Sequence, residues 1–172
     1  DNYEIQELQS LRSTYAFMNQ SEGRALSDKA LRQALLRGLD KQTYCDVLLE
    51  GGATAGKAPV PPTLDFGFDD LNDENSYDPE GAKKLLDDAG IVDTDGDGIR
   101  EIDGENINLH YVSYENRLLN DFSNAHIQYL AEIGIGCTAD YGSSDDQWSK
   151  LAAGDYDFNN NNWITVGTGD PY

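Results

Sequence analysis

The sequence predicts an α/β fold in which helices flank a sheet, and three observations support this class. Residues 79–89 and 117–133 each repeat apolar residues at helical spacing. Residues 107–113 alternate apolar and polar side chains, as a half-buried strand does. Strands and helices then alternate along the chain, which is the order of a sheet covered by helices. With 172 residues and no apolar run near the ~18 residues of a membrane helix, residues 1–172 are expected to form a single domain.

The first half of the chain is expected to hold one strand, two helical segments and a long loop. Residues 12–19 alternate weakly and carry aromatics, so they are predicted to be a strand. Ser27 or Asp28 is positioned to cap a helix. The buried face of this helix is expected to consist of Leu31, Ala34, Leu35 and Leu39. One or two helical turns follow at 41–49. Residues 51–76 are rich in glycine and proline and predict a long loop, either a surface wrap or a functional segment.

The second half begins with the most sharply marked helix, at 79–89. Asp78 can cap its first amides, Pro79 suits its first position, and Gly90 can end it in the left-handed conformation. After the strand 107–113, a helix that is capped by Asn116 should run to about residue 133. Its buried stripe is expected to consist of Leu118, Phe122, Ala125, Tyr129 and Ile133.

The last third should add two strands and one helix. Residues 135–141 are predicted to be a short strand. Asp145 is expected to cap a helix that contains Trp148 and Leu151 and ends at Gly154. Residues 156–166 are predicted to form the final strand.

Composition excludes some classes of partner. The formal net charge is -20, which disfavours nucleic acid and anionic lipid because both require a basic surface. A solvated acidic surface of this kind keeps a protein soluble, and we expect a monomer. Cys45 and Cys137 are expected to be free, buried thiols. His110 and His126 have no neighbouring cysteine or second histidine, so a zinc site or a Ser-His-Asp triad has little support. We expect each of them to be solvated or to make a single bond.

An aspartate-rich turn follows the helix 79–89. Asp93, Asp95 and Asp97 stand at alternate positions before Gly98, as in the first half of an EF-hand calcium loop. The second half departs from that pattern, because Gly104 stands where a bidentate Glu is expected and Arg100 where an aliphatic residue is expected. Two interpretations remain open: a calcium ion bound by the three carboxylates, or a turn whose side chains bond their own backbone amides.

The final strand is unusually polar. Four asparagines, 159–162, precede Trp163, and buried amides are costly unless each finds a partner. Either this strand is an edge, or its asparagines line a polar cleft. Trp163 is a candidate for stacking on a ligand. Trp148 and Tyr156 fit periodic patterns and are more readily explained by core packing.

Several segments, taken in order, resemble the family 5 extracytoplasmic solute-binding proteins, which are the peptide, dipeptide and nickel receptors of ABC importers. The segment YDPEGAKKLLDDAG followed by DTDGDG is the most specific match. The series also includes SDKALRQALLRGLDKQTY, the loop from Gly51 to Pro62, IQYLAEIGIGC, LAAGDYD and the terminal GDPY. Together these segments cover residues 15–172.

The resemblance implies one lobe of a type II periplasmic-binding-protein-like fold, and most of the second lobe of a longer, two-lobed protein. It implies a receptor rather than an enzyme, which holds a peptide between its lobes and delivers it to an ABC permease. By this resemblance the ligand-binding residues are Trp163 and Asp170, with Asn161 a weaker candidate. It also implies an extracytoplasmic location, in the periplasm or as a surface lipoprotein, with the targeting segment outside this sequence.

Three rival functions remain open. Nickel, haem or sugar-like ligands occur in related receptors. A calcium-stabilised structural or adhesive module would rest on Asp93, Asp95 and Asp97. A hydrolase that uses clustered carboxylates is a third class, although paired carboxylates are unremarkable in so acidic a chain. No cofactor is expected to be required, with calcium the one ion that the sequence favours.

Overall fold

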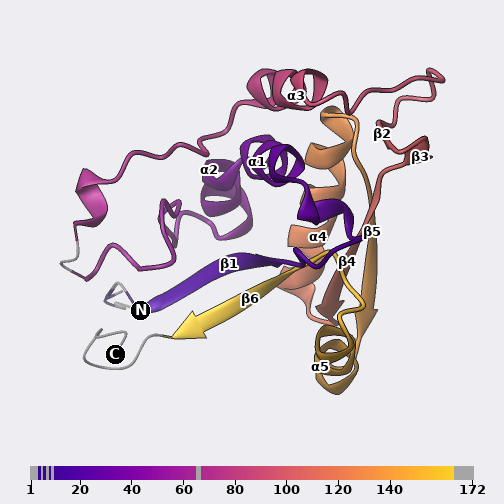
Figure 1. Ribbon diagram of the computed structural model, residues 1–172. Coiled ribbons are helices and arrows are strands. Elements are labelled where there is room, and N and C mark those ends of the chain that lie inside the picture. Colours follow the sequence, from indigo (N-terminus) through magenta and orange to yellow (C-terminus); the bar gives the residue numbers. More distant parts are fainter. Residues whose placement is uncertain (1–3, 5, 7, 9, 65–66, 165–172) are drawn as a thin grey trace.

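The computed structural model describes residues 4, 6, 8, 10–64 and 67–164, with the backbone alone at Arg117, Trp163 and Ile164 (Figure 1). The strands are β1 (Arg12–Met18), β2 (Glu101–Ile102), β3 (Glu105–Asn106), β4 (Asn108–Tyr114), β5 (Gly136–Gly142) and β6 (Phe158–Ile164). The α-helices are α1 (Lys29–Gly38), α2 (Lys41–Thr43), α3 (Pro79–Asp88), α4 (Arg117–Glu132) and α5 (Ser144–Ala153). Two 3-10 helices and one π-helical turn complete the elements: η1 (Ala25–Ser27), η3 (Phe68–Asp70) and the turn η2 (Tyr44–Leu48).

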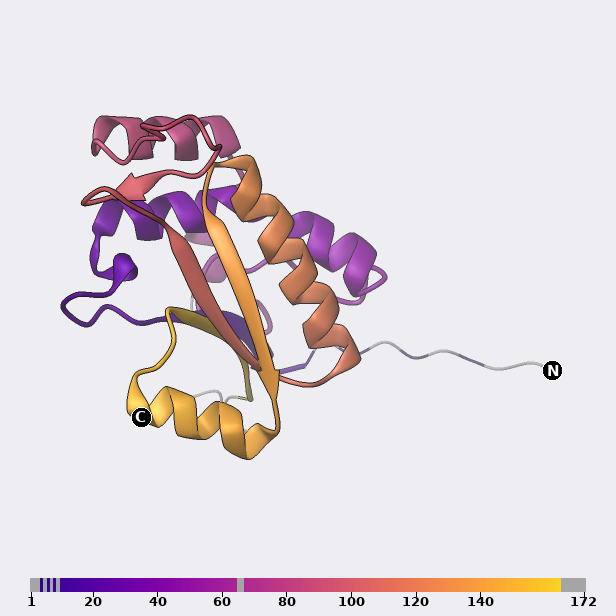
Figure 2. The same ribbon diagram turned by 90° about the vertical axis from the view of Figure 1, so that its right-hand side faces the viewer.

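The main sheet has four strands in the order β1-β6-β4-β5, which confirms the α/β class. β4 runs parallel to both β5 and β6, and β1 is antiparallel to β6. The helices α4 and α5 cover opposite faces (Figure 2). His126 of α4 packs against Tyr111, on one face of the sheet. Tyr111 pairs with Ala139, so the next residue, Asp140, points to the opposite face, where it bonds Lys150 of α5.

The strand β6 leaves β4 soon after it begins. The two strands share one paired position, Tyr111 with Phe158, while β6 pairs with β1 along all seven of its residues. The ribbon of β1 and β6 therefore turns away from β4 and β5, as Figure 1 shows. Beyond Phe158, backbone pairing with β1 and side-chain contacts hold β6.

The core lies between the sheet, α1, α3 and α4. It is formed by fully or nearly buried side chains, including Leu31, Leu35, Leu86, Leu109, Leu130 and Phe158. Gly38 lies where α1 meets α4, because a Cβ there would come within 2.8 Å of the Ile133 Cδ1 atom. The glycine that weakens the helical pattern therefore permits close packing of the two helices.

Most of the predicted helix ends are confirmed. The side chain of Asp28 accepts a bond from the Leu31 amide, Asp78 accepts one from Gly81, and Asn116 accepts one from Leu118. The predicted cap of the last helix was wrong. Ser143 caps α5 in a reciprocal pair with Asp146, so Asp145 lies in the first turn instead.

One prediction of a buried face was confirmed in part and another was wrong. In α4, Phe122 and Ile133 are buried as predicted, Ala125 and Tyr129 are half-buried, and Leu118 is 38% exposed. The buried stripe consists of Leu119, Phe122, Ser123, His126, Leu130 and Ile133. Trp148 is 55% exposed, so it does not pack in the core. In both helices apolar side chains also occur on the outer face, and spacing alone does not separate the two faces.

The long loop 51–76 is tied to the domain at several points among its described residues. Lys41 Nζ donates to the carbonyl of Gly56 and to Asp73, each near 2.9 Å or closer. The ring of Phe68, in η3, is buried, and Lys57 Nζ lies 5.5 Å from its centre. These contacts support the interpretation of the loop as an ordered wrap over the surface.

Candidate functional site

The first candidate region is the carboxyl side of the parallel strands. β4 ends at Tyr114 and β5 at Gly142, which are in register. The helices α4 and α5 begin within three residues of these ends, at the caps Asn116 and Ser143. Ligands of open α/β sheets bind outside the carboxyl ends of the strands. β6 runs in the same direction, so its end at Ile164 belongs to this side of the sheet.

Two of the three predicted ligand-binding residues lie on β6. Asn161 is half-buried and its backbone pairs with Tyr15, while the backbone of Trp163 pairs with Ser13. Asp170 lies outside the described residues. Residues 161–164 form the end of β6 that has turned away from β4, and the segment that carries Asp170 follows directly.

The asparagine run of β6 is only partly paired. β6 lies between β1 and β4 in the sheet order, but it pairs with β4 at Phe158 alone, so it is central at its start and an edge beyond that residue. Asn160 bonds His126, and Asn162 accepts a bond from the hydroxyl of Thr14. Asn159 is 1% exposed, and neither atom of its amide has a hydrogen-bond partner among the described residues. The polar character of this strand is thus buried at its start and exposed toward its end.

A buried relay connects β6 to α4 and η2. The Nδ1 atom of His126 lies 2.8 Å from the hydroxyl of Tyr44, and its Nε2 atom lies 2.8 Å from the amide nitrogen of Asn160. His126 is 2% exposed, and burial lowers its pKa to about 4, so the imidazole is neutral at pH 7. The expectation of a solvated or singly bonded histidine was wrong for His126. The sequence offered one signal, a histidine at helical spacing between Phe122 and Leu130.

His110 fits the expectation of a single bond from its ring. Its Nε2 atom lies 3.1 Å from Asp140, which also accepts a bond from Lys150. The Lys150 bond is the main cause that lowers the pKa of Asp140. Cys45 and Cys137 are free, as expected, although Cys137 is only half-buried. Among the described residues, neither histidine lies in a group able to bind a metal ion.

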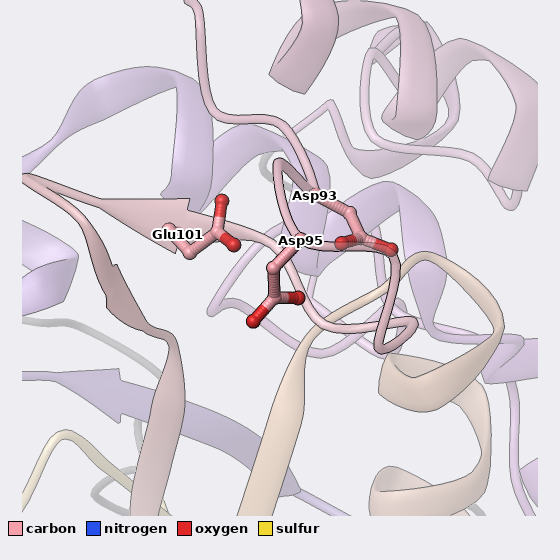
Figure 3. Close-up of side chains that lie close together, drawn as sticks. All are labelled: Asp93, Asp95 and Glu101. Carbon is pink, nitrogen blue, oxygen red and sulfur yellow. The ribbon is translucent and has the colours of Figure 1, made fainter.

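The second candidate region is the acidic turn, which the structure assembles differently from the prediction. Oxygens of Asp93, Asp95 and Glu101 lie within 4.8 Å of one another (Figure 3). Asp97 is not in this group: one of its oxygens accepts from Ile99 and the other from the amide of Asn106. Glu101, at the start of β2, was missed because the strands β2 and β3 are too short to show a periodic pattern.

Each carboxylate of this group also accepts backbone bonds. Asp93 accepts from the amides of Gly96 and Gly98, in that order the main causes that lower its pKa. Glu101 accepts from the amide of Thr94. The arrangement suits a hard cation, which prefers carboxylate oxygens, and it also satisfies the turn by itself. Both interpretations of the sequence remain open.

Arg100 explains why an EF-hand pattern fails at this position. Its Nε atom donates to the carbonyl of Ile133 at 3.0 Å, and its Nη1 atom donates to the carbonyl of Ile91 and to Asp87, both at 2.6 Å. The guanidinium therefore joins the ends of α3 and α4 and fixes the acidic turn between them. A surface hollow of about 370 Å³ beside Arg100 is lined by Asp93, Lys83 and other residues of these segments.

The comparison with protein families extends over the whole chain. The model of the bacterial extracellular solute-binding proteins, family 5 middle region, matches residues 1–172. The chain belongs to this family. Proteins of family 5 are solute-binding proteins, so the expectation that the chain is not an enzyme is confirmed. Among the described residues, no helix combines the length and apolar character needed to cross a membrane.

Individual family 5 proteins are named for different ligands. The chain is 29% identical to the oligopeptide-binding protein AppA of Bacillus subtilis over 128 aligned residues, and the alignment covers 73% of this chain and 24% of AppA. It is 33% identical over 87 residues to the heme-binding protein A of Haemophilus influenzae, which covers 51% of this chain and 16% of that protein. The chain therefore spans about a quarter or less of the length of these relatives.

Solved structures share the fold. AppA of Bacillus subtilis, in complex with a nonapeptide, superposes with a TM-score of 0.79 at 25% identity, over 94% of this chain and 32% of that chain. NikA of Brucella suis, in complex with Fe(III)-EDTA, gives a TM-score of 0.83 at 21% identity, over 95% of this chain and 32% of that chain. The domain thus matches one part of a larger binding protein, as the type II lobe prediction requires.

Proposed function

We propose that the protein is the substrate-binding component of an ABC importer and that its ligand is a peptide. The observation that carries the proposal is the family 5 match over residues 1–172, joined with the relation to the oligopeptide-binding protein AppA. In this proposal the domain is most of one lobe of an extracytoplasmic, monomeric receptor. The ligand lies between this lobe and another, and a permease in the membrane receives it.

The ligand site is proposed at the end of β6. Asn161, Trp163 and Asp170 belong to β6 and the segment that follows it. Beyond Phe158 the β4 side of this strand has no ladder partner among the described residues. Asn159 and Asn160 are buried, whereas Asn161 is half-buried and Asn162 exposed, so the later part of the strand is the part open to a ligand. A peptide can pair with such an edge and add its own hydrogen bonds, with side chains giving specificity. Trp163 would pack on the ligand, and Asp170 would receive its amino terminus.

A receptor for haem, a metal chelate or a sugar is the second candidate, since relatives are named for such ligands. Besides the heme-binding protein A, solved relatives hold Fe(III)-EDTA, Ni(L-His) and mannohexaose. A carboxylate at Asp170 favours a ligand with a positive amino group over haem or a neutral sugar. Calcium at the acidic turn is proposed as a structural ion that is independent of the ligand.

Calorimetry on the longer receptor and on the 172-residue chain tests the proposal. Trialanine and a hexapeptide should bind the two-lobed protein, and far more weakly the single lobe, because one lobe supplies half of the contacts and cannot exclude water. Haemin, Ni(L-His) and mannohexaose serve as competing ligands in the same assay. Binding of one of these, with no heat from either peptide, would assign the receptor to that ligand instead.

A substitution separates the residue assignment from the family function. Asp170→Asn in the two-lobed receptor should weaken peptide binding at least tenfold, because it removes the charge that pairs with the peptide amino group. Asp88→Asn is the matched control, since Asp88 is an exposed residue of α3 paired with Lys84. Unchanged affinity in Asp170→Asn would show that another group binds the amino terminus.

A further inference from the structure

We propose that His126 is a positioning residue for the ligand site: through Tyr44 and Asn160 it sets the course of β6, so that Asn161 and Asn162 shift when the imidazole takes up a proton. The proposal rests on the proposed ligand-binding role of Asn161 at the end of β6. The affinity of this chain for its ligand would then depend on pH. The dependence would originate at Asn160, about three residues before Trp163, inside the lobe rather than in the cleft.

The geometry of the relay carries the inference. His126 of α4 is bonded at both ring nitrogens, to a side chain of η2 and to a side chain of β6. Its ring also lies 5.4 Å from the ring of Tyr111 and 5.8 Å from that of Phe158, measured between centres. Tyr44 is 7% exposed and Asn160 is 7% exposed. The three groups therefore exchange bonds with one another and not with water.

A proton changes what the relay can bond. A neutral imidazole offers one donor and one acceptor, and an imidazolium offers two donors. In the neutral form Nε2 can accept from the amide nitrogen of Asn160 while Nδ1–H donates to the hydroxyl of Tyr44. In the protonated form Nε2–H must donate, so Asn160 has to turn its oxygen toward the ring or lose the bond. Protonation of His126 thus acts directly on a side chain of β6.

The strand has little else to oppose such a change. Pairing between β4 and β6 stops at Phe158, two residues before Asn160. From there onward β6 is held by β1, which is itself the outermost strand of the sheet. The bond from His126 to Asn160 is therefore the described side-chain contact that ties this part of β6 to α4. A shift at Asn160 is transmitted along the strand toward Trp163.

No described carboxylate bonds the imidazole, so a proton there would be uncompensated. The titratable groups that face the relay are tyrosines from η2, α4 and β4, while β6 offers an amide and a phenyl ring. Burial is the main cause that raises the pKa of Tyr44 and of Tyr111. Asp40, at the start of α2, also raises the pKa of Tyr44, and Tyr141 of β5 also raises that of Tyr111. From α1 the core receives leucines and an alanine. Burial lowers the pKa of His126 to about 4, so the relay changes state around pH 4.

Fluorescence of Trp163 tests the inference without any ligand. The chain has two tryptophans, so Trp148→Phe leaves Trp163 as the sole reporter. In this variant the emission should change sigmoidally as the pH falls from 7 to 3, with circular dichroism showing that the chain stays folded. The midpoint should coincide with the titration of the His126 ring protons by NMR. A flat emission while His126 titrates overturns the inference.

Two further variants in the Trp148→Phe background separate positioning from packing. His126→Gln keeps a donor and an acceptor but cannot titrate, so the transition should vanish. Asn160→Asp keeps the shape and places a carboxylate against Nε2, so the midpoint should rise by at least one pH unit. A midpoint that stays in place in Asn160→Asp, or a transition that persists in His126→Gln, refutes the proposal even if one variant fails to fold.

The ligand arm distinguishes this proposal from the proposed function. Calorimetry with trialanine on the two-lobed receptor should give an affinity at pH 3.5 several-fold lower than at pH 7, and Asn160→Asp should enlarge that ratio. If trialanine binds at neither pH while the emission of Trp163 follows His126, the peptide assignment is wrong and the relay stands. Equal affinity at both pH values, with the peptide bound, overturns the link between the relay and the site.

Discussion

Replacement of Arg100 by methionine should destabilise the domain by about 3 kcal/mol. Methionine keeps the apolar stem that covers Gly134, where Arg100 Cγ would lie 3.1 Å from an added Cβ, and removes only the guanidinium. The carbonyls of Ile133 and Ile91 and the carboxylate of Asp87 then lose the hydrogen bonds that the guanidinium donates. The Arg100 side chain is 13% exposed, so water replaces these bonds poorly.

The magnitude follows from the three contacts. Hydrogen bonds from a charged donor contribute about 1.5–3 kcal/mol each, but two that share one guanidinium are not independent. The pair with Asp87 adds at most about 1 kcal/mol, because the Asp87 side chain is 56% exposed. A total near 3 kcal/mol corresponds to a fall in Tm of about 6–12 °C for a chain of this size.

Urea unfolding monitored by circular dichroism measures the effect. Asp87→Asn is the matched control and should cost less than about 1 kcal/mol, since it removes only the exposed ion pair. Arg100→Lys should fall between the two, because an ammonium group cannot make the same fork of bonds. If Arg100→Met unfolds within about 1 kcal/mol of the unmodified chain, the guanidinium does not join the ends of α3 and α4.

Three other outcomes can be checked on the same chain. Leu86→Asp should cost about 3–5 kcal/mol, since Leu86 is fully buried and the new charge has no partner; an unchanged melting temperature would contradict the packing of α3. Calcium should raise the melting temperature, and Asp95→Asn, but not Asp97→Asn, should abolish that gain; identical curves in calcium and in chelator would leave a turn held by hydrogen bonds alone. The pKa of His126, lowered from 6.5 to about 4, means that the unfolded chain binds the proton more readily. Its contribution of about 3 kcal/mol is therefore complete above pH 6.5 and lost as the pH falls toward 4, and His126→Gln should flatten this part of the pH profile of unfolding.

Local signals in the sequence were sufficient for most of the helix ends. Asp78, Pro79 and Gly90 each act within one turn of the chain, and the structure has all three in their expected roles, with Gly90 at φ 76°. The same holds for the start of α1 at Asp28. These residues satisfy or replace specific backbone groups, so a short stretch of sequence contains the whole cause. At α5 the local signal was ambiguous, because Ser143 and Asp145 are both residues that suit a cap, and the prediction took the wrong one.

The faces of α4 and the acidic group depend on distant residues. In α4 the adjacent Leu118 and Leu119 fit either register, and the sheet selects Leu119. Ser123 is fully buried because its hydroxyl donates to the carbonyl of Leu119, a possibility that a pattern of apolar residues does not include. In the acidic group, Glu101 replaces Asp97 because the short pair of β2 and β3 returns the chain toward Asp93. Long-range contact decided both cases, and periodicity contains no information on it.

The asparagine run of β6 lowers the stability of the strand that contains it. A buried amide without a partner costs about 1–3 kcal/mol, and Asn159 is in this position among the described residues. Asn160 avoids that cost only through His126, which is itself kept neutral by burial. Apolar residues would form a more stable central strand, since their burial needs no partner. The polar strand and its dedicated histidine therefore support the proposed binding role of the later residues of β6, because violations of local rules concentrate at functional sites.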